Sequence, residues 1–163
     1  MPDMLVQLLK LPPLEPCLEE MRSQDVVIRR ANPFEATAVR EFVTTHFGTA
    51  WADEVMPGLM SRPGTVALAI REGQIIGFAA FECTRKAFFG PTGVAEAERG
   101  KGIGKALLVA SMWGLRELGY VYGIIGGAGP TGFYEGVVGA AAIPDSSPGI
   151  YEHMLRSKPK ADA

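Results

Sequence analysis

Hydrophobic and polar positions follow two different periods along the chain, which predicts a protein built from both strands and helices. Apolar runs rich in Val, Ile and Phe predict strands at residues 4–11, 26–30, 65–71, 74–84, 87–94, 121–125, 140–143 and 150–155. Apolar positions three and four residues apart predict helices at residues 14–21, 33–47, 103–118 and 130–138. A shorter, broken helix is expected through Trp51 and Val55, limited by Pro57-Gly58 and followed by a mobile connection to Pro63-Gly64.

The helix predicted at residues 103–118 is apolar on most of its circumference, so it must be buried against a sheet. Together with the strands before and after it, this helix predicts a parallel, right-handed crossover. Glu72-Gly73 predicts a two-residue hairpin, and Pro91 with its neighbouring glycines predicts a bulge in its strand. We therefore expect an α/β fold with a bent, mixed central sheet and helices on both faces.

No repeat or linker divides the 163 residues, so we expect one domain over residues 25–157. Residues 1–24 predict an N-terminal strand and helix that pack on the same domain, with contact to a second subunit of a homodimer as the alternative. Residues 158–163 are expected to form a flexible tail.

Composition and charge argue against several classes of protein. The net charge of −2 and the pI near 5.7 are not those of a protein whose main partner is nucleic acid. The two cysteines and two histidines lack metal-ligand spacing, so no metal site is expected. The first residues lack the basic start and the continuous apolar core of a signal peptide, and no apolar run is long enough to span a membrane. We expect a cytoplasmic protein with free thiols.

A glycine-rich loop joins a predicted strand to the buried helix, and it consists of Arg99, Gly100, Lys101, Gly102, Ile103, Gly104 and Lys105. The first N–H groups of a helix lack internal acceptors, and the helix dipole adds positive charge there, so such a junction binds anions. Glycines let a phosphate approach the amides, and the three basic side chains favour a pyrophosphate. The alternative for the same spacing is a surface turn with solvated lysines.

Two familiar phosphate-binding motifs do not fit this loop. A Walker A motif needs Gly where Arg99 stands and Ser or Thr where Ala106 stands. The dinucleotide fingerprint needs Gly or Ala at the position of Lys105 and an acidic residue about 20 residues further on, which is missing. A nucleoside triphosphatase and a dinucleotide-dependent enzyme are therefore not expected.

Residues 93–134 resemble the GNAT superfamily of acyl-CoA-dependent N-acyltransferases. The family motif is Gln or Arg, two residues, Gly, one residue, then Gly or Ala, and it is matched by Arg99, Gly102 and Gly104. A strand that ends in Gly-Val before the motif is also typical of the family, as is the later run Phe133-Tyr134-Glu135 followed by Gly139-Ala140. The resemblance implies the GNAT fold and acetyl-CoA as co-substrate, bound by Thr92, Gly93, Val94, Arg99, Gly100, Lys101, Gly102, Ile103, Gly104 and Lys105.

The resemblance also implies catalytic roles. A backbone amide near Val94 would hold the oxyanion, and Tyr134 would donate a proton to the leaving thiolate. The strand before the Gly-Val pair contains no carboxylate, so Glu82 on the preceding strand is the nearest candidate for the general base. The other candidates are a water molecule, Asp53, Glu54, Glu96 and Glu98, and of these Asp53 and Glu54, with Trp51, are expected near the acceptor. Gly127 stands where many family members have an Asn that contacts the pantetheine arm.

These features predict transfer of an acetyl group from acetyl-CoA to a primary amine, by direct attack through a tetrahedral intermediate. The sequence leaves open whether the amine is a polyamine, an amino sugar, an amino acid or a protein N-terminus. Two alternatives belong to other classes: a non-catalytic acyl-CoA-binding module, and a dimeric interaction protein with a degenerate site. An O-acyl acceptor is a further possibility within the enzyme class.

Overall fold

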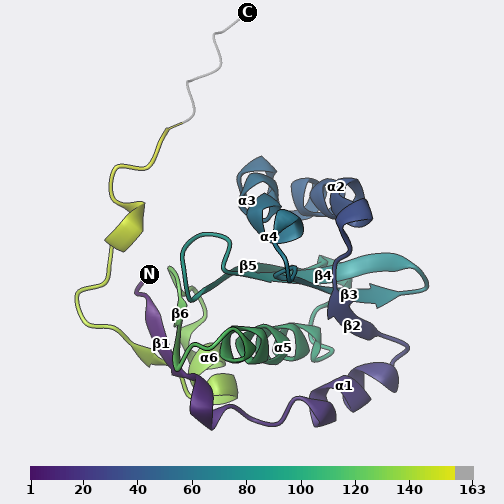
Figure 1. The fold of residues 1–163 in the computed structure, drawn as a ribbon, viewed down its shortest axis with the longest axis horizontal. Helices are drawn as coiled ribbons and strands as arrows, with labels where there is room; N and C mark the ends of the chain where they lie inside the picture. Colours follow the sequence, from purple (N-terminus) through teal and green to yellow (C-terminus); the bar gives the residue numbers. More distant parts are fainter. Residues whose placement is uncertain (157–163) are drawn as a thin grey trace, which may run out of the picture.

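The computed structural model describes residues 1–156, and the tail predicted at residues 158–163 lies outside them. In the described part, a seven-stranded sheet has the order β2-β3-β4-β5-β6-β1-β7, and helices cover both of its faces (Figure 1). The pair β5 and β6 is parallel, whereas the other neighbouring pairs are antiparallel. The predicted α/β fold with a mixed sheet is confirmed.

The strands are β1 (Met4–Gln7), β2 (Val27–Arg30), β3 (Val66–Arg71), β4 (Gln74–Phe81), β5 (Phe88–Val94), β6 (Tyr122–Ile125) and β7 (Ala141–Ala142). The α-helices are α1 (Glu15–Arg22), α2 (Ala36–Phe47), α3 (Thr49–Glu54), α4 (Met56–Met60), α5 (Ile103–Glu117) and α6 (Thr131–Val138). Short 3-10 helices are η1 (Leu8–Lys10), η2 (Pro33–Glu35), η3 (Glu96–Glu98) and η4 (Gly149–Tyr151).

The sheet separates two hydrophobic cores. Helices α2, α3 and α4 lie on one face, and α1, α5 and α6 lie on the other (Figure 1). Side chains of β3 and β4 alternate between the cores: Leu68 and Phe78 pack under α2 to α4, whereas Ala69 and Phe81 pack against α5. Both faces of the sheet centre are therefore buried, and β3 and β4 support the strands beside them.

Helix α5 is the crossover between β5 and β6, as its apolar circumference predicts. Its buried side chains include Leu107, Leu108 and Met112. The ring of Phe81 packs on the helix at Gly114, where a Cβ atom would lie only 2.4 Å from the ring. This close packing ties the C-terminal half of α5 to β4.

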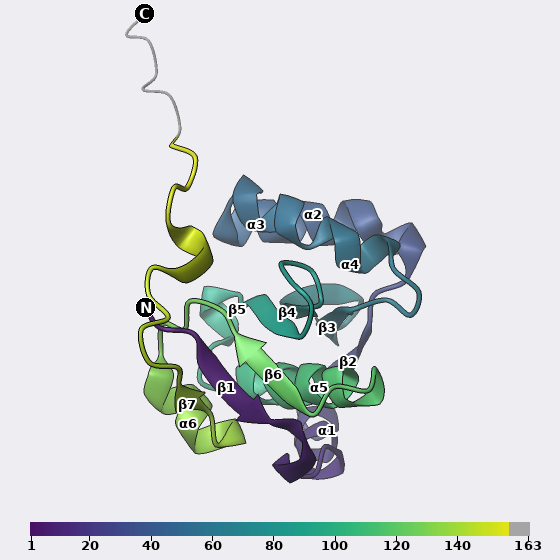
Figure 2. The ribbon, with the colours of Figure 1, turned by 60° about the vertical axis from the view of Figure 1, so that its left-hand side comes forward.

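The N-terminal strand is part of the sheet itself. β1 lies between β6 and β7 and is antiparallel to both (Figure 2). Met4, Val6 and Leu8 have no exposed surface. Helix α1 then packs against α5, where the indole Nε1–H of Trp113 donates a hydrogen bond to the carbonyl oxygen of Pro12 at 2.9 Å.

Three expectations for the elements were wrong. Residues 150–155 form no strand in the structure, and the short helix η4 ends at Tyr151. A strand is disfavoured here because Pro148 offers no N–H for a ladder and Gly149 turns the chain with a φ of 56°. Pro57 and Gly58 do not limit a helix but lie inside α4, because a proline in the first turn needs no N–H partner. Strand β4 stops at Phe81, since Glu82 has a φ of 61°.

Within residues 1–156, no helix is both long enough and apolar enough to cross a membrane. The same residues contain no group of three or more His, Cys, Asp or Glu side chains arranged to hold a metal ion.

Candidate functional site

Strands β5 and β6 separate soon after they meet, and this separation opens a cleft. They pair only at Phe88 with Ile124 and at Phe89 with Ile125. Beyond that point Pro91 has no N–H to donate, and β6 ends at Ile125 before a glycine-rich turn. The ladder between β4 and β5 shifts register beside Pro91, which confirms the predicted bulge. A cleft of about 530 Å³ lies in the gap.

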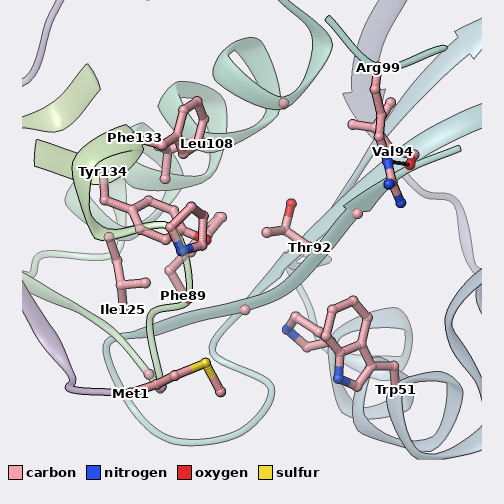
Figure 3. Close-up of a pocket in the computed structure, with 18 residues that line it drawn as sticks. Met1, Trp51, Phe89, Thr92, Val94, Arg99, Leu108, Ile125, Phe133 and Tyr134 are labelled. Atoms are coloured by element: carbon pink, nitrogen blue, oxygen red, sulfur yellow. Dashed lines mark hydrogen bonds between the residues drawn. The ribbon is translucent and has the colours of Figure 1, made fainter. Parts of the chain in front are cut away.

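The cleft is mostly apolar. Figure 3 shows Phe133 and Tyr134 of α6 with Leu108 of α5 on one side, Trp51 of α3 on the other, and Thr92 between them. Its lining is completed by main-chain and side-chain atoms of Met1, Phe89, Gly90, Pro91, Gly93, Val94, Arg99, Gly104, Ile125, Gly126, Gly127, Gly129 and Pro130. Such a channel can accept a long, largely uncharged chain that is polar at a few points.

The open edge of β5 presents main-chain amides to the cleft. The N–H of Ala95 donates to the carbonyl oxygen of Ile76 on β4 at 2.9 Å. Because successive amides of a strand point in opposite directions, the N–H of Val94 points away from β4 and toward the gap. The cleft therefore contains a hydrogen-bond donor that β6 leaves unpaired.

The N-terminus of α5 faces the same cleft. Its first hydrogen bond runs from the N–H of Ala106 to the carbonyl oxygen of Gly102 at 3.1 Å, so the three preceding helical amides have no acceptor within the helix. Gly102 adopts the left-handed conformation with φ 84°. Gly104 lines the cleft, and a Cβ atom there would meet nothing closer than Val94 at 3.8 Å. The loop and helix start are thus accessible to an anion.

The basic side chains around the loop have different surroundings. The Nε–H of Arg99 donates to the carbonyl oxygen of Val94 at 3.1 Å, which holds the guanidinium at the cleft (Figure 3). Lys101 pairs with Glu98 at 2.9 Å, and Arg71 pairs with the same carboxylate at 2.6 Å. Hydrogen bonds from Lys101 and Arg71 lower the pKa of Glu98. Lys105 is exposed on the first turn of α5. Arg99 is therefore the basic side chain that lines the cleft.

Tyr134 lies on the floor of the cleft. It comes from α6 and is 7% exposed. Its ring packs edge-on against Phe89 and Phe133, with centroids 6.3 and 5.3 Å apart. Burial raises the pKa of the Tyr134 hydroxyl, so the phenol stays protonated at neutral pH and can donate a proton.

Glu82 lies outside this cleft. Its carboxylate accepts hydrogen bonds from the N–H of Ala87, from Lys86 Nζ at 3.3 Å and from Tyr120 Oη at 3.2 Å. The left-handed backbone at Glu82 makes this local turn, in which the side chain caps the loop before β5. Proximity in sequence to β5 is therefore misleading, and we do not retain Glu82 as a base.

The four other acids differ in their position. Glu96 and Glu98 are in η3, and Asp53 is 76% exposed with Arg40 at 3.9 Å. Of these four, Glu54 lines a second cavity that is distinct from the cleft, and Asp53, Glu96 and Glu98 line neither of the two.

This second cavity measures about 540 Å³ and adjoins the cleft at Trp51, Phe89, Gly90 and Pro91. Its remaining lining comes from Met1, Ala50, Glu54, Thr84, Phe88, Gly126, Gly127, Ser147, Pro148, Tyr151 and Met154. Of Trp51, Asp53 and Glu54, which the sequence predicted near the acceptor, Trp51 and Glu54 line this cavity and Asp53 does not, whereas Thr84, Phe88 and the segment around Tyr151 were not foreseen. No local pattern could have revealed that segment, because it reaches the cavity only through the fold.

Known structures share this architecture. A GCN5-related glucosamine N-acetyltransferase region of a fungal multi-domain β-N-acetylglucosaminidase aligns over 87% of this chain with a TM-score of 0.71 and 17% identity. A GCN5-related N-acetyltransferase from Sphaerobacter thermophilus aligns over 87% with a TM-score of 0.63 and 20% identity. A protein from Drosophila also aligns over 87%, with a TM-score of 0.58 and 14% identity. These matches show a common fold, and this chain spans 19%, 48% and 47% of the three proteins, respectively.

No curated protein sequence matches this chain. The model of the acetyltransferase (GNAT) family matches residues 30–125, which is more than half of the sequence and runs from the end of β2 to the end of β6. The resemblance carried by the loop from Arg99 to Lys105 is thus confirmed, and the chain belongs to the acetyltransferase (GNAT) family.

Proposed function

We propose that the protein transfers an acetyl group from acetyl-CoA to a primary amine. The observation that carries this proposal is the meeting of two features in one cleft: the open amide edge of β5 and the free N-terminus of α5. A thioester with a long uncharged arm and a pyrophosphate needs both features, a few ångströms apart along one channel.

The residues of this chain fit such a ligand. The amides at the start of α5 would receive the pyrophosphate, because a Cβ atom at Gly100 would have nothing within 4 Å and one at Gly104 nothing closer than 3.8 Å. Arg99 would add a positive charge beside it. The apolar walls formed by Leu108 and Phe133 suit an alkyl arm.

The chemistry requires a neutral amine, a stabilised oxyanion and a proton for the thiolate. An amine with a pKa of about 10.4 costs roughly 4.6 kcal/mol to deprotonate at pH 7, which desolvation and a base must supply. The amide of Val94 would donate to the oxyanion, since it points into the cleft. Tyr134 would protonate the thiolate, because its hydroxyl remains a phenol at neutral pH.

The first test is calorimetric titration of acetyl-CoA into the wild type and into Gly104→Val. Because a Cβ atom at Gly104 has space but points along the cleft, the variant should fold and bind at least ~10-fold more weakly. The matched control is Gly136→Val on α6, where nothing lies within 4 Å and no cavity is lined. Failure of the wild type to bind at millimolar acetyl-CoA, or equal binding by both variants, would remove the proposal.

A second candidate function is a non-catalytic acyl-CoA-binding module. The observation that favours it is the lining of the cleft, which among residues 1–156 contains no carboxylate to act as a base. Such a module would bind acetyl-CoA in the calorimeter but release no free thiol with any amine.

A further inference from the structure

The second cavity indicates which amine the site accepts. Resting on the proposed function, we propose that the acceptor is a compact primary amine with one positive charge and an apolar, aromatic body, whose ammonium group is bound by Glu54 and gives up its proton to that carboxylate before the amine attacks the thioester. Polyamines and free amino acids are excluded by the same chemistry.

The cavity is continuous with the cleft at the point where transfer would occur. Both are lined by Trp51, Phe89, Gly90 and Pro91, the part of β5 that carries the bulge. An amine in the second cavity can therefore approach the open edge of β5 from the side opposite to α5. The C-terminal segment closes this side, because Tyr151 packs directly over Gly127, where a Cβ atom would lie 2.9 Å from its ring.

Charge sets the first limit on the acceptor. Among the described residues that line the cavity, Glu54 carries the only side chain that is charged at neutral pH. It is half-buried, and the hydroxyl of Thr84 donates to its Oε1 and fixes its direction. One carboxylate matches one ammonium group. A polyamine would bury a second, unmatched cation, and an amino acid would bury a carboxylate without a basic partner.

Tyr151 does not add a second negative charge. Burial raises its pKa, and the nearby carboxylates of Glu54 and Asp3 raise it further. The phenol is therefore neutral, and its ring forms part of an apolar wall.

The residues that form the cavity walls limit the shape and polarity of the acceptor. They are mostly aromatic or apolar and consist of Met1, Trp51, Phe88, Phe89, Pro91, Pro148, Tyr151 and Met154. Trp51 is held by stacking on Phe47, with ring centroids 5.4 Å apart and planes at 26°, and Phe47 packs in turn on Phe78. A fixed indole beside a carboxylate is a favourable setting for an alkylammonium group with an aromatic body.

The test compares three amines by thiol release at saturating acetyl-CoA. These are 2-phenylethylamine, phenylalanine, which differs from it only by a carboxylate, and spermidine. We expect kcat/KM for 2-phenylethylamine to exceed both others by at least ~10-fold. A preference for spermidine or phenylalanine would overturn the inference and leave the proposed function standing.

Two variants test the role of Glu54. Glu54→Gln should raise the KM for 2-phenylethylamine at least ~10-fold and leave acetyl-CoA affinity unchanged. The matched control is Asp53→Asn, which changes a neighbouring but 76% exposed carboxylate and should behave as the wild type. Equal KM values for the two variants would overturn the assignment of Glu54.

Calorimetry distinguishes a failure of the proposed acetyl transfer from a failure of the inferred acceptor class. If no amine is acetylated, 2-phenylethylamine is titrated directly into the CoA-saturated protein. Binding that is weakened by Glu54→Gln and not by Asp53→Asn would support the inferred ligand class while the proposed reaction fails. Absence of binding would overturn the inferred ligand class, and the titration of acetyl-CoA then decides on the proposed function separately.

Discussion

Tyr134 combines burial with a place on the floor of the cleft. Its raised pKa keeps the proton on the phenol over the whole neutral range. Tyr134→Phe should therefore lower kcat for amine acetylation by ~100-fold or more, with little change in acetyl-CoA affinity. In the wild type kcat should fall on the alkaline side only above the ordinary tyrosine pKa of 10.0, because burial raises the pKa of Tyr134, and this fall should be missing in the variant.

Tyr122→Phe provides the control for this prediction. Tyr122 is on β6, is 54% exposed and lines neither cavity. Its loss of a hydroxyl should leave kcat and the pH profile as they are. Identical turnover by wild type and Tyr134→Phe at every pH would show that another group, or water, supplies the proton.

Among single residues, the sequence indicated those on the side of the cleft where the cofactor is expected, but not those around the second cavity. Arg99 was indicated by its place in the glycine-rich loop before the helix, and Val94 and Tyr134 by the resemblance to the GNAT family. Glu54 depends on a hydroxyl 30 residues away in sequence, at Thr84, and on the wall that Tyr151 forms. Which of several acids faces a cavity is decided by such distant contacts, and spacing does not encode them.

Among the elements, the start of α2 carries a charge whose effect can be measured. Glu35 caps the helix by accepting from the N–H of Asn32 at 2.7 Å, and it binds Arg29 through both carboxylate oxygens. The hydrogen bond from Arg29, followed by that from Asn32, lowers the pKa of Glu35 to about 2. The charged form is thus favoured in the folded protein.

The lowered pKa of Glu35 predicts how the stability of the protein changes with pH. A lowered pKa gives stability that is complete above the ordinary value of 4.5 and is lost as the pH falls toward 2. Glu35→Gln should lower the free energy of urea unfolding by about 1 kcal/mol at pH 7, and the difference from wild type should shrink below pH 4.5. Glu15→Gln is the control, because Glu15 and its partner Arg22 are 62% and 55% exposed. A difference that does not change with pH would contradict the predicted role.

Helix α5, the Glu72-Gly73 hairpin and the crossover were predictable because each is set by a local period or a turn dipeptide. The strand expected at residues 150–155 was not formed, since a strand also needs a free partner edge, and the chain has left the sheet after Ala142. Patterns within an element thus predict its type far better than whether a partner exists for it.

For the whole molecule, the position of β1 decides stability. Leu8 follows β1 directly, is fully buried in the core around α5, and donates its N–H to the carbonyl oxygen of Val121 at 2.9 Å. Leu8→Ala should lower the free energy of unfolding by ~2–5 kcal/mol, measured by urea titration. Leu9→Ala, at a residue that is 60% exposed, should change it by less than ~0.5 kcal/mol. Similar losses in the two variants would mean that the first residues are not part of the core.

The place of β1 in the sheet was beyond sequence reasoning. Its apolar pattern indicates a strand, but the choice between an added edge, a second subunit and a position between β6 and β7 depends on contacts about 120 residues apart. The clefts beside β5 follow from that choice, because Met1 lines both of them.

The same strand order has a consequence for biosynthesis. On the ribosome, β1 emerges before the other strands of this sheet, and its partners β6 and β7 are translated more than a hundred residues later. The sheet half that carries β2 to β5 can form while the chain is still growing, whereas the apolar residues of β1 must wait, exposed to other nascent chains and to chaperones. At synthesis rates of about 5–20 residues per second this interval lasts for several seconds, so a slowed ribosome would prolong the stage at which the nascent chain is most prone to aggregate.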